Sequence, residues 1–256
     1  LVFMRYVVHV AFMFVVWGRR DPASLWRTRR PVYQLARSSL MLVMPASFLF
    51  GIQRGVDERT IMAIFWLSPL LILALAGALL RERASLPVWT AALLASAGAR
   101  LALGSGPMPP LPLLVLPVAM AASFGVYVVM TRSLRTETTR ANLFYTAFGV
   151  VVLLAPFVPR IWITPTVTEL LLMIVVGVLG FAGLYALDRA TEAAPVAASA
   201  PLLYVQVPLM ALAMRLTGQG SIGKRVFVGT IVIGLAGAYL WNRGRQDGVE
   251  VLSPAG

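Results

Sequence analysis

The chain has 256 residues, of which 59% are hydrophobic and 12% are charged. Because soluble globular domains carry roughly 25% charged residues, this composition excludes an ordinary soluble domain. The apolar stretches are continuous rather than alternating, which favours membrane helices over the strands of a membrane barrel. The chain contains no cysteine, so disulfides, thiolate metal ligands and thiol chemistry are excluded.

Apolar windows bounded by charged residues, glycine and proline predict nine membrane spans. Nine helices of about 20 residues each leave room for short loops but not for a separate soluble domain. In chain order, the predicted spans are 1–17, 38–53, 61–80, 86–103, 113–131, 141–158, 170–187, 193–214 and 226–241. The predicted fold class is therefore all-α, a polytopic helical membrane protein.

The first predicted span begins at Leu1 without a basic segment before it, a pattern that is not typical of a cleavable signal peptide. The strongest interruption in the chain is the linker GSGPMPPLP at 104–112, because glycine and proline prevent a helix from continuing there. It separates four spans in 1–103 from five spans in 113–241. The remaining residues, 242–256, are predicted to form a cytoplasmic tail.

The formal net charge is +12 at pH 7, a balance that often indicates nucleic-acid or other anionic partners. The placement of the basic residues explains it better, since short loops rich in Lys and Arg stay in the cytoplasm. Of the 22 Lys and Arg residues, 14 fall on one side of the predicted spans, six on the other and two within spans. We therefore predict a multi-pass protein of the inner cell membrane, with its first residue outside and its C-terminus in the cytoplasm. The lipid bilayer is a predicted partner and nucleic acid is not.

Three residues in the stretch 68–103, SPLLILALAGALLRERASLPVWTAALLASAGARLAL, follow a recognisable order: Pro69, Glu82 and Gly98. A proline-bearing helix, a Glu thirteen residues later in a short turn, and then a glycine-containing helix resemble the end of the first half of EamA-type transporters. These belong to the drug/metabolite transporter superfamily. The opening FMRYVVHV, with Arg5, is similar to the second helix of that family.

The second half resembles the same pattern less closely, in the run 194–220 and at Gly229. Gln219 or Gly220 stands near the place of the second Glu, so this copy departs from the family pattern. The family has ten helices in two inverted five-helix repeats. The resemblance therefore implies that the four-plus-five arrangement here is a 5+5 fold lacking the first helix of its first repeat, in 1–103, with the second repeat in 113–241. An odd division with this orientation is also what inverted transporter repeats produce.

Ionisable side chains at membrane depth are expensive, so Arg5 and His9 are candidate functional residues. At about 1.5 Å per residue, His9 lies roughly 12 Å and Arg5 roughly 18 Å above the cytoplasmic boundary of a core about 30 Å thick. The two share a helix face and would give a cationic lining suited to an anionic or zwitterionic substrate. The alternative is that Arg5 reaches the outer interface while His9 hydrogen-bonds a neighbouring helix. All ten acidic residues fall in loops or at predicted span ends.

The eighth predicted span carries Ser199 and Gln206 seven residues apart, on one face of an α-helix. Pro201 and Pro208 flank this face, and their missing N–H groups free carbonyls in the preceding turn, a feature of helices that line transport cavities. Tyr204 points away from this face and is predicted to be an interhelical contact.

Trp66 and Ser68, beside Pro69, occupy the related place in the third predicted span. They are therefore candidate cavity residues, and interhelical packing or hydrogen bonding is the alternative. Pro69, like the two prolines of the eighth span, is a predicted helix break.

The chain has one His, no Cys and no HExxH or GxSxG motif, so hydrolase and metalloenzyme classes are disfavoured and no metal or cofactor is predicted. The resemblance implies a secondary transporter of small organic metabolites, an exporter, that works by alternating access. Since no ATPase motif is present, transport would use a gradient or exchange. A non-transporting structural or regulatory membrane subunit is the alternative. The predicted partner is a small-molecule substrate, and the sequence is compatible with a homodimer.

Overall fold

The computed structural model describes residues 1–104, 106–218 and 223–252, and these residues form helices and loops without a strand. Within them, seven helical segments are long and apolar enough to cross a membrane, and two shorter apolar helices accompany them. The chain is thus a polytopic helical membrane protein. The long segments are Pro31–Gln53, Glu58–Leu80, Leu86–Leu103, Leu111–Ser133, Val167–Ala193, Val196–Leu216 and Lys224–Arg243, and the shorter ones are Val2–Gly18 and Thr139–Leu154.

The helices form two compact units, each described here by itself. Unit 1 comprises Leu1–Ala46 and Val126–Pro195, and unit 2 comprises Ser47–Gly125 and Val196–Gly256. Each unit takes segments from both sides of the predicted linker at 104–112. The compact units are therefore not the two predicted repeats, which stay a prediction.

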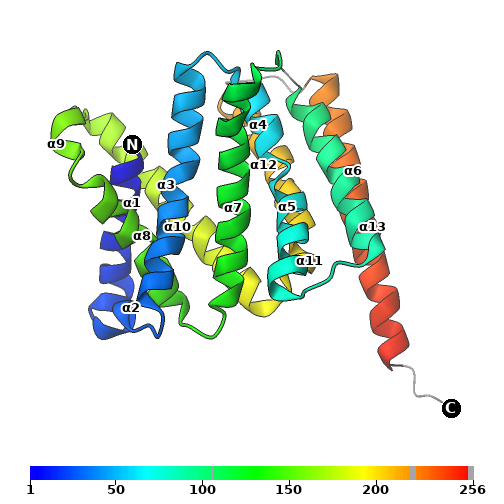
Figure 1. The fold of residues 1–256 in the computed structure, drawn as a ribbon, viewed down its shortest axis with the longest axis horizontal. Coiled ribbons are helices and arrows are strands. Elements are labelled where there is room, and N and C mark those ends of the chain that lie inside the picture. Colours follow the sequence, from blue (N-terminus) through cyan, green and yellow to red (C-terminus); the bar gives the residue numbers. More distant parts are fainter. Residues whose placement is uncertain (105, 219–222, 253–256) are drawn as a thin grey trace. The chain divides into compact units, whose positions relative to one another are not determined.

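Unit 1 is built around α1, which lies against α8 and α10 (Figure 1). Glycines on α10 permit this approach, because a β-carbon at Gly177 would come within 2.6 Å of Val8 and one at Gly180 within 2.7 Å of Arg5 Nε. The elements of unit 1 are α1 (Val2–Met13), η1 (Phe14–Gly18), α2 (Ala23–Trp26), the first part of α3 (Pro31–Gln53), the second part of α7 (Val115–Ser133), α8 (Thr139–Leu154), α9 (Val158–Ile161) and α10 (Val167–Ala193).

Unit 2 contains the closest helix pair, α6 and α13, which run side by side (Figure 1). A β-carbon at Gly98 on α6 would lie 2.9 Å from the carbonyl oxygen of Gly229 on α13, so the two backbones are in direct contact. Unit 2 includes the last part of α3 and the first part of α7. Its other elements are α4 (Glu58–Phe65), α5 (Ser68–Leu75), η2 (Ala76–Leu80), α6 (Leu86–Leu103), η3 (Leu111–Leu114), α11 (Val196–Ser199), η4 (Ala200–Val205), α12 (Gln206–Leu216) and α13 (Lys224–Leu252).

Several helices extend beyond the spans predicted from hydropathy. The predicted span 86–103 coincides with α6, but α3 begins at Pro31 rather than at 38. The charged side chain of Arg37 ended the apolar window, although the helix continues through it. In the same way, α10 runs on to Ala193.

The C-terminal region also differs from the expectation of a tail after residue 241. The helix α13 continues to Leu252, so residues 242–252 of the predicted tail are helical. Residues 253–256 lie outside the described residues. So do Gln219 and Gly220, the two positions compared with the second family Glu.

Candidate functional site

Arg5 and His9 lie together on the face of α1 that packs against α10. His9 is 1% exposed, and its ring makes edge contacts with the rings of Tyr6 at 5.1 Å and Phe181 at 5.9 Å. The guanidinium of Arg5 lies over Gly180, where any side chain would displace it. Arg5 Nε and His9 Nε2 are both buried without a hydrogen-bond partner. Since buried donors are nearly always paired, two unpaired atoms on one helix face are unusual.

Trp66 and Ser68 lie at an interruption between α4 and α5. The helix α4 ends at Phe65, Trp66 adopts a non-helical ψ of 6°, and α5 begins at Ser68 with Pro69 in its first turn. Proline is tolerated at that position because the first N–H groups of a helix have no intrahelical acceptor. The break turns both side chains inward, and Trp66 is 5% exposed and Ser68 fully buried.

Ser199 and Gln206 do not share the face that an unbroken α-helix would give them. Residues 200–205 form the 3₁₀-helix η4, with Pro201 in its first turn, and α12 begins at Gln206 with Pro208 close to its start. A 3₁₀-helix turns about 20° more per residue than an α-helix, so six residues rotate the face by about 120°. As a result Gln206 is exposed, while Ser199 is half-buried and donates a hydrogen bond to the Val196 carbonyl.

The same rotation turns Tyr204 inward, where it meets Trp66. The two ring centroids are 6.1 Å apart with an interplanar angle of 35°, and Tyr204 is fully buried. Trp66, Ser68 and Tyr204 form what we call the aromatic cluster of unit 2. Tyr204 thus makes the interhelical contact that the sequence predicted, here with Trp66.

A buried polar network in unit 1 was not found from the sequence. Arg37 is 1% exposed and donates to Thr131 Oγ1 at 2.8 Å, to Gln34 Oε1 at 2.8 Å, to the Asn142 carbonyl at 2.6 Å and to Thr146 Oγ1 at 3.0 Å. Its guanidinium carbon lies 5.1 Å from the centre of the Tyr127 ring. The sequence assigned Arg37 to a cytoplasmic loop, where it would only set the topology.

The network continues to a buried carboxylate, Asp188 of α10. Gln34 donates to Asn142 Oδ1 at 2.6 Å, and Asn142 Nδ2 donates to Asp188 Oδ1 at 3.1 Å. Asp188 is 5% exposed, although it lies only five residues before the end of α10 at Ala193. Polar residues at helical spacing, as in Asn142 and Thr146, are the one sequence signal that marks this network.

Glu82, one of the three residues in the family resemblance, accepts a hydrogen bond from the N-terminus of a helix. It follows Arg81, which has a left-handed φ of 59° and ends η2. One oxygen of the Glu82 carboxylate accepts a hydrogen bond from the backbone N–H of Val196 at 2.8 Å, at the first residue of α11. A carboxylate at a helix N-terminus satisfies a free donor and is favoured by the helix dipole. Glu82 therefore positions the interrupted segment that carries Ser199 and Tyr204.

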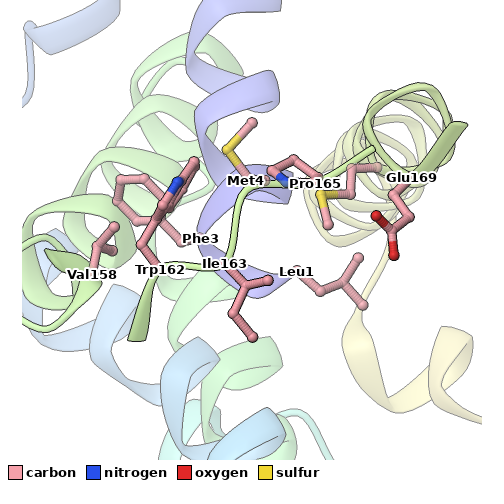
Figure 2. A pocket seen from close by; sticks show the side chains of 9 residues that line it. Leu1, Phe3, Met4, Val158, Trp162, Ile163, Pro165 and Glu169 are labelled. Carbon is pink, nitrogen blue, oxygen red and sulfur yellow. The ribbon is translucent and has the colours of Figure 1, made fainter. Parts of the chain in front are cut away.

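A half-open cavity of about 320 Å³ lies in unit 1 between the start of α1, α9 and the start of α10 (Figure 2). Glu169 also lines the cavity. Its carboxylate accepts a hydrogen bond from the backbone N–H of Thr166 and forms the capping box at the start of α10. None of the predicted site residues lines it. Its lining is mostly apolar and consists of Leu1, Phe3, Met4, Val158, Trp162, Ile163, Pro165, Glu169 and Met173.

Metal binding has no support in the described ranges, where no three His, Cys, Asp or Glu side chains gather in a group that could hold an ion. The buried polar groups described above include hydrogen-bond donors, hydroxyls, amides and a single carboxylate, that of Asp188. Such groups bind and orient organic molecules.

Comparison with known proteins points to membrane transport. No family model matches the chain. The chain is 25% identical over 225 residues to an S-adenosylmethionine uptake transporter of Rickettsia bellii (strain RML369-C), covering 88% of this chain and 76% of that protein. It is 24% identical over 225 residues to the protein of the same name in Rickettsia conorii (strain ATCC VR-613 / Malish 7), covering 88% and 75%. These relatives support the class of membrane transporters for small metabolites.

The fold itself also has a solved counterpart. A crystal structure of a protein with 19% sequence identity matches with a TM-score of 0.82 and covers 96% of this chain and 87% of the other. At this identity the match shows a shared fold. The helix arrangement of the chain is therefore one that occurs in a solved protein.

Proposed function

We propose that the chain is a secondary transporter of small organic metabolites, of the EamA type within the drug/metabolite transporter superfamily. The observation that carries this proposal is the match to two named transporters over 88% of the chain. The buried, unpaired donors on helices of membrane-span composition support it, since polar groups at such depth mark substrate pathways. The proposed architecture has nine spans from two inverted repeats, 1–103 and 113–241, and works by alternating access.

The proposed substrate carries an anionic or zwitterionic group. S-adenosylmethionine is the first compound to test because both relatives are named for it, although its sulfonium gives the whole molecule a net charge of about +1. Its amino-acid group is a zwitterion whose carboxylate suits Arg5. We propose Arg5, His9, Trp66, Ser68, Ser199 and Gln206 as substrate-contacting residues, with Pro69, Pro201 and Pro208 at the helix breaks. A secondary transporter has no built-in direction, since net flux follows the gradients. The family resemblance implies export and the names of the relatives state uptake, so flux has to be measured both ways.

The test is flux of labelled S-adenosylmethionine in proteoliposomes that contain the complete chain, loaded from either side. We expect saturable flux that Arg5→Ala reduces by at least tenfold, because the carboxylate loses its cation. The matched control is Arg20→Ala, which removes an exposed arginine and should leave flux within twofold. Gln206→Ala tests the exposed glutamine in the same assay. Folded protein that moves neither this compound nor any of a panel of metabolites would favour the alternative, a non-transporting membrane subunit.

A further inference from the structure

The aromatic cluster of unit 2 contains three buried polar atoms without a hydrogen-bond partner: Trp66 Nε1, Ser68 Oγ and the Tyr204 hydroxyl. The Tyr204 hydroxyl interacts with Ser96 but forms no hydrogen bond of regular geometry. A buried donor or acceptor left unpaired carries a desolvation cost that no hydrogen bond offsets. The Trp66 indole N–H and the Ser68 hydroxyl stand two residues apart at the interruption between α4 and α5, and packing does not explain why both are left unpaired.

Apolar residues of the same shape would give the same packing without this cost. Phe in place of Trp66 or Tyr204 keeps a ring, and Ala in place of Ser68 keeps the volume almost unchanged. The neighbouring rings are already apolar, with Phe65 at 5.4 Å from Trp66 and Phe124 at 5.6 Å from Phe65. The indole N–H of Trp66 and the hydroxyl of Ser68 are thus the features of the cluster that require a separate explanation, and a bound ligand supplies one.

The chemistry of the cluster restricts what that ligand can be. The indole nitrogen is a donor only, so it requires an acceptor, whereas the two hydroxyls can donate or accept. The flat faces of Trp66 and Tyr204, tilted by 35°, favour a planar ring. An isolated carboxylate or phosphate is disfavoured because, among the described residues, no Arg, Lys or His bonds to these three side chains. A cation alone would use the ring faces but not the indole N–H.

We propose that the aromatic cluster is the subsite for a planar nitrogen heterocycle of the nucleobase class, which stacks on Trp66 or Tyr204 and accepts a hydrogen bond from Trp66 Nε1. The inference rests on the proposed function and assigns one part of the substrate to one set of residues. Both rings lie beside helix interruptions, Trp66 between α4 and α5 and Tyr204 in η4. Because Tyr204 is fully buried and the two rings are already 6.1 Å apart, binding would require these two segments to separate.

The test uses two probes that divide S-adenosylmethionine chemically: adenosine, which has the ring, and S-methylmethionine, which has the sulfonium and the amino acid but no ring. Binding to the purified complete chain in nanodiscs is measured by calorimetry. We expect Trp66→Phe to weaken adenosine three- to tenfold, the equivalent of one net hydrogen bond, and to leave S-methylmethionine unchanged. Ser68→Ala should act in the same direction. Trp89→Phe, in α6, is the matched control and should leave both affinities unchanged.

The hydrogen bond itself is tested with adenosine analogues in which one ring nitrogen is replaced by carbon. One of these analogues should bind the unaltered protein three- to tenfold more weakly than adenosine. The same analogue and adenosine should bind the Trp66→Phe variant equally well, because that variant already lacks the indole N–H. Thermal melting of each variant in detergent checks folding. Failure of adenosine to bind the folded protein, or an equal loss for both probes in Trp66→Phe, would overturn the subsite. The flux assay above decides transport independently, so the subsite can fail while the proposed function stands.

Discussion

Arg37 is held inside unit 1 by acceptors from its own helix and from α7 and α8. A buried charge is tolerated only when its donors are paired and a countercharge is close, because removal from water costs several kcal/mol per ion. Four of its hydrogen bonds reach Gln34, Thr131, Asn142 and Thr146. The countercharge is Asp188, which interacts electrostatically with Arg37 and is linked to it through Gln34 and Asn142.

This arrangement predicts coupling between the two charges. Arg37→Met should destabilise the protein by about 3 kcal/mol, and Asp188→Asn by about 2 kcal/mol, since each leaves the other charge buried without compensation. The double variant should lose at least about 1 kcal/mol less than the sum. Denaturant unfolding in detergent measures all three, with the exposed Arg20→Met as a control within about 0.5 kcal/mol. Strict additivity would show that Asp188 is not the countercharge.

The sequence could not reveal this network because its acceptors are far away along the chain. Thr131 and Thr146 are 94 and 109 positions from Arg37. Hydropathy averages only neighbouring residues, so the charge of Arg37 ended the predicted span at that position. Arg5 and His9 were found by the same reasoning because their charges lie well inside an apolar window, where no loop is available.

At the scale of elements, a proline predicts neither that a helix is interrupted nor how, since Pro45 lies inside the continuous helix α3. Pro69 and Pro201 each stand in the first turn of a new segment, α5 and η4. Whether the segment after Pro201 is α-helical or 3₁₀-helical decides which side chains share a face, and composition does not specify it. The predicted pairing of Ser199 with Gln206 depended on that choice, whereas the pairing of Trp66 with Tyr204 follows from the observed 3₁₀ turn.

The contact between α6 and α13 predicts opposite changes in stability when two different glycines are replaced. Gly98→Val should destabilise by at least about 2 kcal/mol, because a β-carbon there already meets Gly229 O at 2.9 Å and Ile233 Cγ1 at 3.0 Å. Gly234→Ala, on α13 with nothing within 4 Å of the new β-carbon, should stabilise by about 0.5–1 kcal/mol through helix propensity. Thermal unfolding in detergent compares the two. Similar effects at both positions would contradict direct backbone contact in this pair.

At the scale of the whole molecule, both sequence halves contribute to each compact unit. Unit 1 joins Leu1–Ala46 to Val126–Pro195, and unit 2 joins the remaining segments. Hydropathy predicts the helices because each spanning helix must pair its own backbone polar groups and present apolar side chains to lipid. It does not predict which helices associate, because helix contacts in a membrane depend on small residues and buried polar groups that are scattered along the chain. The helical membrane class was therefore accessible to sequence reasoning, and the composition of the units was not.

The last prediction concerns α8, the shorter apolar helix Thr139–Leu154. Its 16 residues span about 24 Å, less than a hydrocarbon core of about 30 Å, so its crossing is the critical step in a nine-span topology. The chain has no native cysteine, and Arg135 and Arg160 are exposed on either side of α8. In intact cells, a membrane-impermeant maleimide should label Arg160→Cys but not Arg135→Cys, which should react only after permeabilisation. Met108→Cys, in the linker predicted to lie outside, is the positive control. Equal labelling of Arg135→Cys and Arg160→Cys would mean that α8 does not cross, and the nine-span orientation would then be wrong.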